Sequence, residues 1–79
     1  MPRYSVDEEI DMIGTPGLLT EREAEVFVLR DVKAVRRQEV ASELGIAVST
    51  VDNTLTRANR KIREAREALE AIDAVRHQM

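Results

Sequence analysis

Apolar residues recur at helical spacing through most of the chain, and no segment alternates as a half-buried strand does. The clearest helix start is at Thr20, which forms with Glu23 the T-x-x-E pattern of a capping box. Leu19 and Ala24 flank this start and can pack together as a hydrophobic staple. The apolar stripe that follows consists of Ala24, Phe27, Val28, Leu29 and Val32. This pattern predicts a helix over residues 21–32.

A second, shorter helix is predicted over residues 37–44, and it has the spacing of the first helix in a helix-turn-helix. The small side chain of Ala41 lets the next helix cross closely over it. Gly45 follows where a tight turn needs a positive φ. The space beneath the two crossing helices would be filled by Val40, Leu44, Ile46, Val51 and Leu55.

A long C-terminal helical run begins near residue 47 and contains no Gly or Pro up to the end of the chain. Its apolar residues step alternately by four and three, as in a heptad seam: Val51, Leu55, Ala58, Ile62, Ala65, Leu69 and Ile72. The first half of this seam is expected to pack on the helix over residues 21–32. Little core remains for the half from Ala65 onward.

The N-terminal segment over residues 1–17 is acidic and less regular. Ser5 and Glu8 could form a capping box, with Val6, Ile10 and Ile13 on one helical face. Residues 14–17, Gly-Thr-Pro-Gly, then end any helix. Either a short helix or a flexible arm is therefore predicted. The fold class is all-α with three or four helices, in which a helix-turn-helix domain (residues 18–63) precedes a C-terminal helical extension (residues 64–79).

The composition adds a reason to expect association with another chain. The 79 residues make one small domain with a marginal core, and without cysteine no disulfide or thiolate zinc site can strengthen it. A homodimer is therefore predicted. Its interface would consist of Ala65, Ala68, Leu69, Ile72 and Val75.

Charge and composition also exclude several kinds of site. No apolar run is long enough for a membrane span, and the N-terminus lacks the apolar core of a secretory signal, so a cytoplasmic protein is expected. No metal site, cofactor or catalytic set is predicted, because His77 stands alone and Ser49, Thr50 and Asp52 have no base beside them. The net charge of -3 hides a basic block: residues 30–66 carry nine basic and five acidic side chains.

Three blocks of the sequence together resemble a known DNA-binding motif. Residues 19–26, 39–46 and 49–51 are similar to the helix-turn-helix that LuxR-type regulators share with the fourth region of bacterial sigma factors, in the winged-helix-like superfamily. Residues 55–62 are closer to the sigma type. As a short chain with a C-terminal helix, the protein also resembles the archaeal Tfx-type DNA-binding proteins. The resemblance covers about residues 18–66.

The resemblance implies that the helix after the turn enters the major groove of double-stranded DNA. Its outward positions would be Ser49, Thr50, Asp52, Asn53, Thr56, Arg57 and Arg60. Asn53 could bond adenine, Arg57 could bond guanine or phosphate, and Thr50 could help hold a phosphate at the helix start. Backbone contacts are implied for Lys33, Arg36 and Arg37, and the basic stretch continues through Arg60, Lys61 and Arg63.

The chain departs from the family pattern at four positions. Ala34 stands near a position where the family has Gly, and Arg36 and Ala47 stand where it has a capping Ser. Both helix starts could therefore be shifted, with Ser49 as an alternative cap for the second. Asp52 replaces a common Lys or Arg and would repel phosphate unless it accepts from a cytosine amino group.

These observations predict a sequence-specific transcriptional regulator that binds double-stranded DNA as a homodimer, with RNA polymerase or another regulator as a further candidate partner. The main alternative is a protein-interaction module or adaptor that contacts the transcription machinery without reading DNA. A third reading, the promoter-reading domain of a sigma factor on its own, is less favoured. A chain that starts at Met1 and has this length leaves no room for the other sigma regions.

Overall fold

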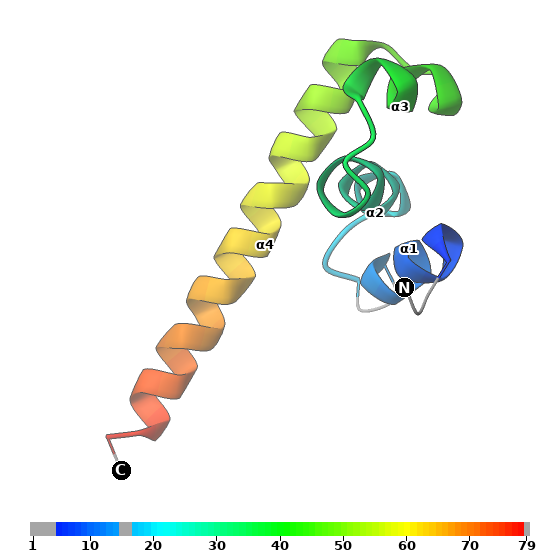
Figure 1. Ribbon diagram of the computed structural model, residues 1–79. Helices are drawn as coiled ribbons and strands as arrows, with labels where there is room; N and C mark the ends of the chain where they lie inside the picture. Colours follow the sequence, from blue (N-terminus) through cyan, green and yellow to red (C-terminus); the bar gives the residue numbers. More distant parts are fainter. Residues whose placement is uncertain (1–4, 15–16, 79) are drawn as a thin grey trace.

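A computed structural model describes residues 5–14 and 17–78, and the regular structure in these residues is entirely helical. The elements are α1 (Val6–Gly14), α2 (Glu21–Phe27), the π-helical segment η1 (Val28–Val32), α3 (Arg37–Leu44) and α4 (Val48–Arg76). The predicted all-α class is confirmed. Helices α2 and α3 lie against the first half of α4, whose second half extends alone away from them (Figure 1).

Helix α1 shows that residues 6–14 form the short helix and not the flexible arm. Its capping box is present: the Glu8 N–H donates to Ser5 Oγ at 3.1 Å, and the Ser5 N–H donates to Glu8 Oε1 at 3.4 Å. Val6 and Ile10 are partly buried against the core. The side chain of Ile13 lies outside the described part of the chain, as do residues 15–16.

Helix α2 begins at Glu21 as predicted, behind the expected capping box. The Glu23 N–H donates to Thr20 Oγ1 at 3.2 Å, and the Thr20 N–H donates to Glu23 Oε1 at 2.9 Å. The staple residues Leu19 and Ala24 are both buried in one cluster with Ala58. The local pattern therefore specified the start of this helix correctly.

The end of the predicted helix over residues 21–32 differs from the prediction. Its last five residues form the π-helical η1, in which the Lys33 N–H donates to the Val28 carbonyl at 2.9 Å. A π-helical turn is wider than an α-helical turn and rotates the following side chains. Val32, expected in the apolar stripe, is 49% exposed, whereas Val26, which the stripe omitted, is fully buried.

Ala34 follows η1 in the left-handed region, with a φ of 56°. The adjacent turn is closed by a 2.8 Å hydrogen bond from the Val35 N–H to the Leu29 carbonyl. The family that the sequence resembles has a glycine near this position. The backbone therefore keeps a conformation that suits glycine although the residue is alanine.

Both helix starts that lack a capping Ser stand where the pattern placed them, so the expected shift does not occur. Arg36 and Ala47 occupy the N-cap positions with extended backbone and no side-chain hydrogen bond. Ser49 is the second residue of α4 and not its cap. Gly45 ends α3 with a φ of 67°, and its N–H donates to the Ala41 carbonyl. The tight turn of the helix-turn-helix is therefore made as predicted.

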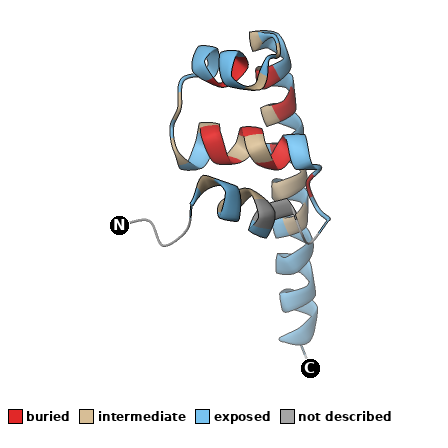
Figure 2. Ribbon diagram, turned by 90° about the vertical axis from the view of Figure 1, so that its right-hand side faces the viewer, coloured by how far each residue is buried: buried red, intermediate tan, exposed pale blue. Residues whose placement is uncertain are grey.

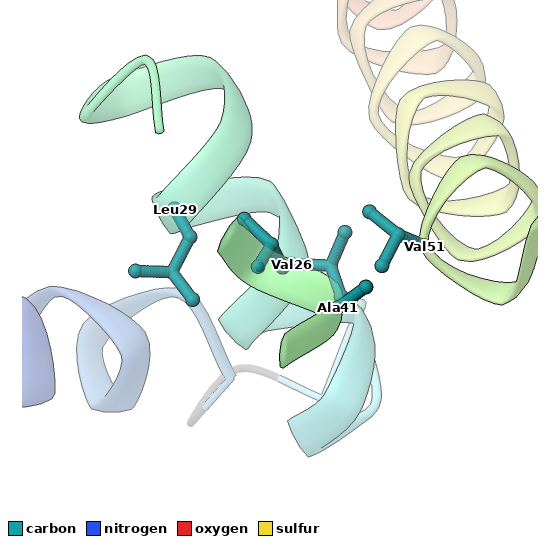
Figure 3. Close-up of a cluster of buried hydrophobic side chains, with 5 residues drawn as sticks. Val26, Leu29, Ala41 and Val51 are labelled. Atoms are coloured by element: carbon teal, nitrogen blue, oxygen red, sulfur yellow. The ribbon is translucent and has the colours of Figure 1, made fainter. Parts of the chain in front are cut away.

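Two buried clusters join the helices. The first consists of Val26, Leu29, Val40, Ala41 and Val51 (Figure 3). The apolar residues predicted beneath the crossing helices belong to it or pack against it from partly buried positions: Val40, Leu44, Ile46, Val51 and Leu55. The second joins Leu19, Ala24 and Ala58, with Ile62 packed beside them. The first half of the α4 seam is thus part of the core.

The second half of α4 makes no such contacts in the described part of the chain. Leu69, Ile72 and Val75 are 63%, 47% and 64% exposed, and Figure 2 shows this end of the helix as exposed throughout. The seam therefore changes from core to surface near Ala65, which is partly buried.

Candidate nucleic-acid interface

The outward face of α4 is polar. Val51, Thr54 and Ala58 point into the core and are buried. At 100° per residue, the positions opposite to them along the helix are 49, 53, 56 and 60. Those positions hold Ser49, Asn53, Thr56 and Arg60, all exposed. We call these four residues the outward face of α4. Short polar side chains near the helix start, followed by an arginine, can reach base edges and phosphates in a groove.

Asp52 lies at the flank of this face and is paired within the protein. Its Oδ2 accepts a hydrogen bond from Arg37 Nη1 of α3 at 2.8 Å. Both side chains are about half exposed, so the pair adds only ~0.2–1 kcal/mol to stability. The pair does reduce the local negative charge that the sequence suggested would repel phosphate. The carbonyl of Asp52 also accepts a hydrogen bond from Thr56 Oγ1 at 2.9 Å.

Glu23 of α2 contacts two cationic side chains of α4. Lys61 Nζ lies 2.7 Å from Glu23 Oε1, and Arg57 Nε lies 3.8 Å from Glu23 Oε2. The Glu23 side chain is only 6% exposed. Its pKa is lowered, first by the hydrogen bond from Lys61 and then by the backbone N–H of Thr20, while burial acts in the opposite direction. Arg57 Nη2 also donates to Thr54 Oγ1 at 3.3 Å.

Lys33 is held in a similar way by an acidic residue of α1. Its Nζ lies 2.9 Å from Glu9 Oε1, and both side chains are largely buried. In the same segment of the chain, Arg30 Nη1 donates to the Val35 carbonyl at 2.8 Å. The Lys33 ammonium therefore points toward α1 and not toward the outward face of α4.

The predicted DNA-binding residues thus divide into two groups. Lys33, Lys61, Arg37 and Asp52 are engaged in close ion pairs within the chain. The second group has no ion pair shorter than 3.7 Å among the described residues and consists of Arg36, Ser49, Thr50, Asn53, Thr56, Arg57, Arg60 and Arg63. In this group Arg36 makes a loose 3.7 Å pair with Glu39 and is 82% exposed, so its guanidinium is available to a phosphate.

Sequence reasoning missed the two acidic partners, Glu9 and Glu23. The sequence pattern predicts only a capping-box role for Glu23, and Glu23 does form that capping box. Its contact with Lys61 joins residues 38 positions apart, and the contact between Glu9 and Lys33 joins residues 24 apart. No local spacing rule predicts such pairs, because ion pairs are recognisable from sequence only a few residues apart on one helix.

The predicted dimer residues lie along the exposed half of α4. Ala68, Leu69, Ile72 and Val75 are exposed, and Ala65 is partly buried. A shallow apolar groove is lined there by Ala71, Ile72, Val75 and Arg76.

Among the described residues, no three His, Cys, Asp or Glu side chains are grouped closely enough to hold a metal ion. None of the helices described is both long and apolar enough to cross a membrane.

The fold and this surface define a helix-turn-helix domain, and comparison with known proteins specifies its kind. The sequence model of the family "Sigma-70, region 4" matches residues 17–62. The chain therefore belongs to the sigma-70 region 4 family. The sigma-type part of the sequence resemblance is confirmed, while the likeness to LuxR-type regulators and to archaeal Tfx-type proteins stays a prediction.

A curated relative is similar to part of the chain. The chain is 40% identical over 47 residues to a protein named "Positive control factor" from Bacillus subtilis (strain 168). The matched region is 60% of this chain but only 28% of that relative. No solved structure gives a significant match.

Proposed function

We propose that this chain binds double-stranded DNA in a sequence-specific manner and regulates transcription. The observation that carries the proposal is the outward face of α4, where Ser49, Asn53, Thr56 and Arg60 stand opposite the buried positions of the same helix. In a helix-turn-helix, this face of the second helix enters the major groove. Membership of the sigma-70 region 4 family and a relative named a positive control factor support this role.

The remaining exposed cations supply candidate phosphate contacts. Arg36 precedes α3, and Arg63 extends the basic stretch of α4. Thr50 and the backbone N–H groups in the first turn of α4 can hold one further phosphate. Such contacts orient the protein on the duplex and carry no sequence information, which is left to Asn53, Thr56 and Arg57. This role would fit the cytoplasmic location that the sequence predicts.

The salt dependence of binding to a random-sequence duplex tests the proposal. If α4 and its flanking cations contact phosphates, log K should fall linearly with log salt, with a slope near -0.9 for each phosphate neutralised. Absence of binding at low salt would contradict the proposal. Selection of binding sites from a random pool would then show whether a preferred sequence exists.

We also propose that the exposed half of α4 forms a homodimer interface. Leu69 and Ile72 continue the seam whose first half is buried in the core, and Val75 is exposed one turn further along the helix. Large apolar side chains in such a row favour a partner surface. Two copies would present two DNA-reading helices to a duplex.

A second candidate function is a protein-interaction module that contacts RNA polymerase or another regulator without reading DNA. The same exposed apolar row favours it. A chain that shows no salt-dependent affinity for duplex DNA but binds one of these proteins would have this function instead.

A further inference from the structure

Glu23 brings two cationic side chains of the DNA-reading helix to one buried carboxylate. Its Oε1 accepts hydrogen bonds from Lys61 Nζ at 2.7 Å and from the Thr20 N–H at 2.9 Å. Its Oε2 lies 3.8 Å from Arg57 Nε. The carboxylate is charged at neutral pH, since its pKa is lowered. Lys61, with 34% of its side chain exposed, is therefore partly withdrawn from the surface.

We propose that Glu23 is a specificity-determining residue of the DNA-binding surface. It withholds the Lys61 ammonium from DNA phosphates and holds the Arg57 guanidinium in a fixed orientation. This inference rests on the proposed DNA-binding function and adds to it a residue that does not itself touch DNA.

The physical reason lies in how non-specific affinity arises. Binding to random DNA grows with the number of phosphates that cations neutralise, whatever the base sequence. A cation held by an internal carboxylate no longer contributes fully to that number. Affinity that depends on base edges is not reduced in the same way, because base contacts come from other side chains and from an oriented arginine.

The orientation of Arg57 follows from two contacts. Its Nε faces Glu23, and its Nη2 donates to Thr54 Oγ1 at 3.3 Å. Its Nη1 has no hydrogen bond within the described part of the chain, and the side chain is 51% exposed. Glu23 and Thr54 thus hold one edge of the guanidinium and leave the other for a base or phosphate. A planar guanidinium held in this way loses less freedom on binding.

Glu23→Gln separates this role from the capping role of the same residue. Glutamine also completes a T-x-x-Q capping box, so the start of α2 is retained while the charge is lost. The slope of log K against log salt on random duplex should steepen by about 0.9 if only Lys61 becomes free to contact a phosphate. It should steepen by about 1.8 if Lys61 and Arg57 both become free. The preference for a selected duplex over random duplex should fall by about two- to fivefold.

Glu25→Gln is the matched control. It changes the net charge equally and lies on the same helix, but Glu25 pairs at 3.9 Å with Arg22 and not with α4. For Glu25→Gln, the slope of log K against log salt should stay close to that of the unchanged chain. Circular dichroism of both variants checks that the helices are retained. If both variants show the same slope and the same preference, the role of Glu23 is overturned.

A second comparison does not depend on the folding of the Glu23 variant. Lys61→Gln in the otherwise unchanged chain should flatten the slope less than Arg60→Gln, because Lys61 is already paired and Arg60 has no ion pair among the described residues. Equal flattening by the two variants would overturn the proposal. Failure of the unchanged chain to bind any duplex would instead contradict the proposed function, and this inference with it.

Discussion

Ala34 is the residue at which the backbone conformation and the residue type disagree. Its φ of 56° lies in the left-handed region, which costs a residue with a Cβ about 1–2 kcal/mol. The conformation persists because the hydrogen bond from the Val35 N–H to the Leu29 carbonyl closes the turn around it. The strain is therefore held by the packing of the surrounding turn and not by the residue itself.

Ala34→Gly should stabilise the protein. Glycine removes the strain, although its greater freedom in the unfolded chain offsets about 0.4–1 kcal/mol of the gain. We expect a net increase of up to about 1 kcal/mol in the free energy of unfolding, measured by urea denaturation. Ala74→Gly, the same change inside α4, should instead lower stability by up to about 1 kcal/mol. A lower free energy of unfolding for Ala34→Gly than for the unchanged chain would contradict the backbone strain inferred at Ala34.

Glu23 should make stability depend on pH in the acid range. Its folded-state pKa is below the ordinary value of 4.5, because Lys61 and the Thr20 N–H stabilise the charged form. The stabilisation is therefore complete above that value and is lost as the pH falls through the lower, folded-state pKa. Unfolding measured at a series of pH values should show a steeper acid loss in the unchanged chain than in Glu23→Gln. If stability falls with decreasing pH equally in the unchanged chain and in Glu23→Gln, Glu23 is not the source of the acid dependence.

Arg57 and Arg36 should differ in the kind of DNA affinity they supply. Arg57→Ala should cost about 1–3 kcal/mol in binding to a selected duplex if it pairs with guanine, with a smaller loss on random duplex. Arg36→Ala should weaken binding to all sequences and flatten the salt slope by about 0.9. Equal losses for Arg57→Ala on both duplexes would reassign that residue to phosphate contact.

At the scale of the elements, α4 combines two tasks in one helix of 29 residues. Its first half supplies Val51, Thr54 and Ala58 to the core and the outward face to the surface. Its second half leaves Leu69 and Ile72 exposed. The start of α4 is weaker than its length suggests, because Ala47 provides no side-chain acceptor for the free N–H groups of the first turn.

Ala47→Ser should therefore stabilise the helix-turn-helix. Ala47 already has the extended backbone of an N-cap, with φ of -71° and ψ of 151°, so a serine hydroxyl can accept a first-turn N–H without rearrangement. We expect a gain of about 1 kcal/mol in the free energy of unfolding by thermal or urea denaturation. Ser49→Ala should have a smaller effect, since Ser49 lies inside the helix. A larger loss from Ser49→Ala would mean that it caps the helix after all.

The observed helix bounds show which local sequence patterns were sufficient to predict where a helix begins or ends. The capping boxes at Ser5 and Thr20 and the glycine cap at Gly45 depend on residues a few positions apart, and all three were predicted and are present. The π-helical end of α2 was not predicted, because no residue pattern distinguishes it from an α-helical end. It is formed together with the turn at Ala34 that leads into α3.

At the scale of the whole molecule, the acidic N-terminal helices neutralise part of the basic block. Glu9 of α1 pairs with Lys33, and Glu23 of α2 pairs with Lys61 and Arg57. The net charge of -3 therefore arises from acidic and basic segments that are folded against each other. For a DNA-binding chain, this arrangement would lower affinity for arbitrary sequences while leaving Arg36, Arg60 and Arg63 exposed.

The exposed half of α4 should determine the state of association. A chain ending at Arg63 keeps every residue of the two buried clusters and should be monomeric at concentrations where the full chain dimerises. In the full chain, Leu69→Glu with Ile72→Glu should have the same effect without shortening the helix. Sedimentation equilibrium measures both. Association of the truncated chain as strong as that of the full chain would place the dimer surface elsewhere.

The sequence by itself determined where α2, α3 and α4 begin, the capping box at Thr20, the glycine cap at Gly45 and the apolar positions beneath the helix-turn-helix. These follow from interactions between residues close in the chain and from the helical period. Only the tertiary structure decided which charges remain available to a partner. The pairs of Glu23 with Lys61, Glu9 with Lys33 and Arg37 with Asp52 join residues 38, 24 and 15 positions apart. Such pairs exist because packing brings separate helices together, and no local pattern contains that information.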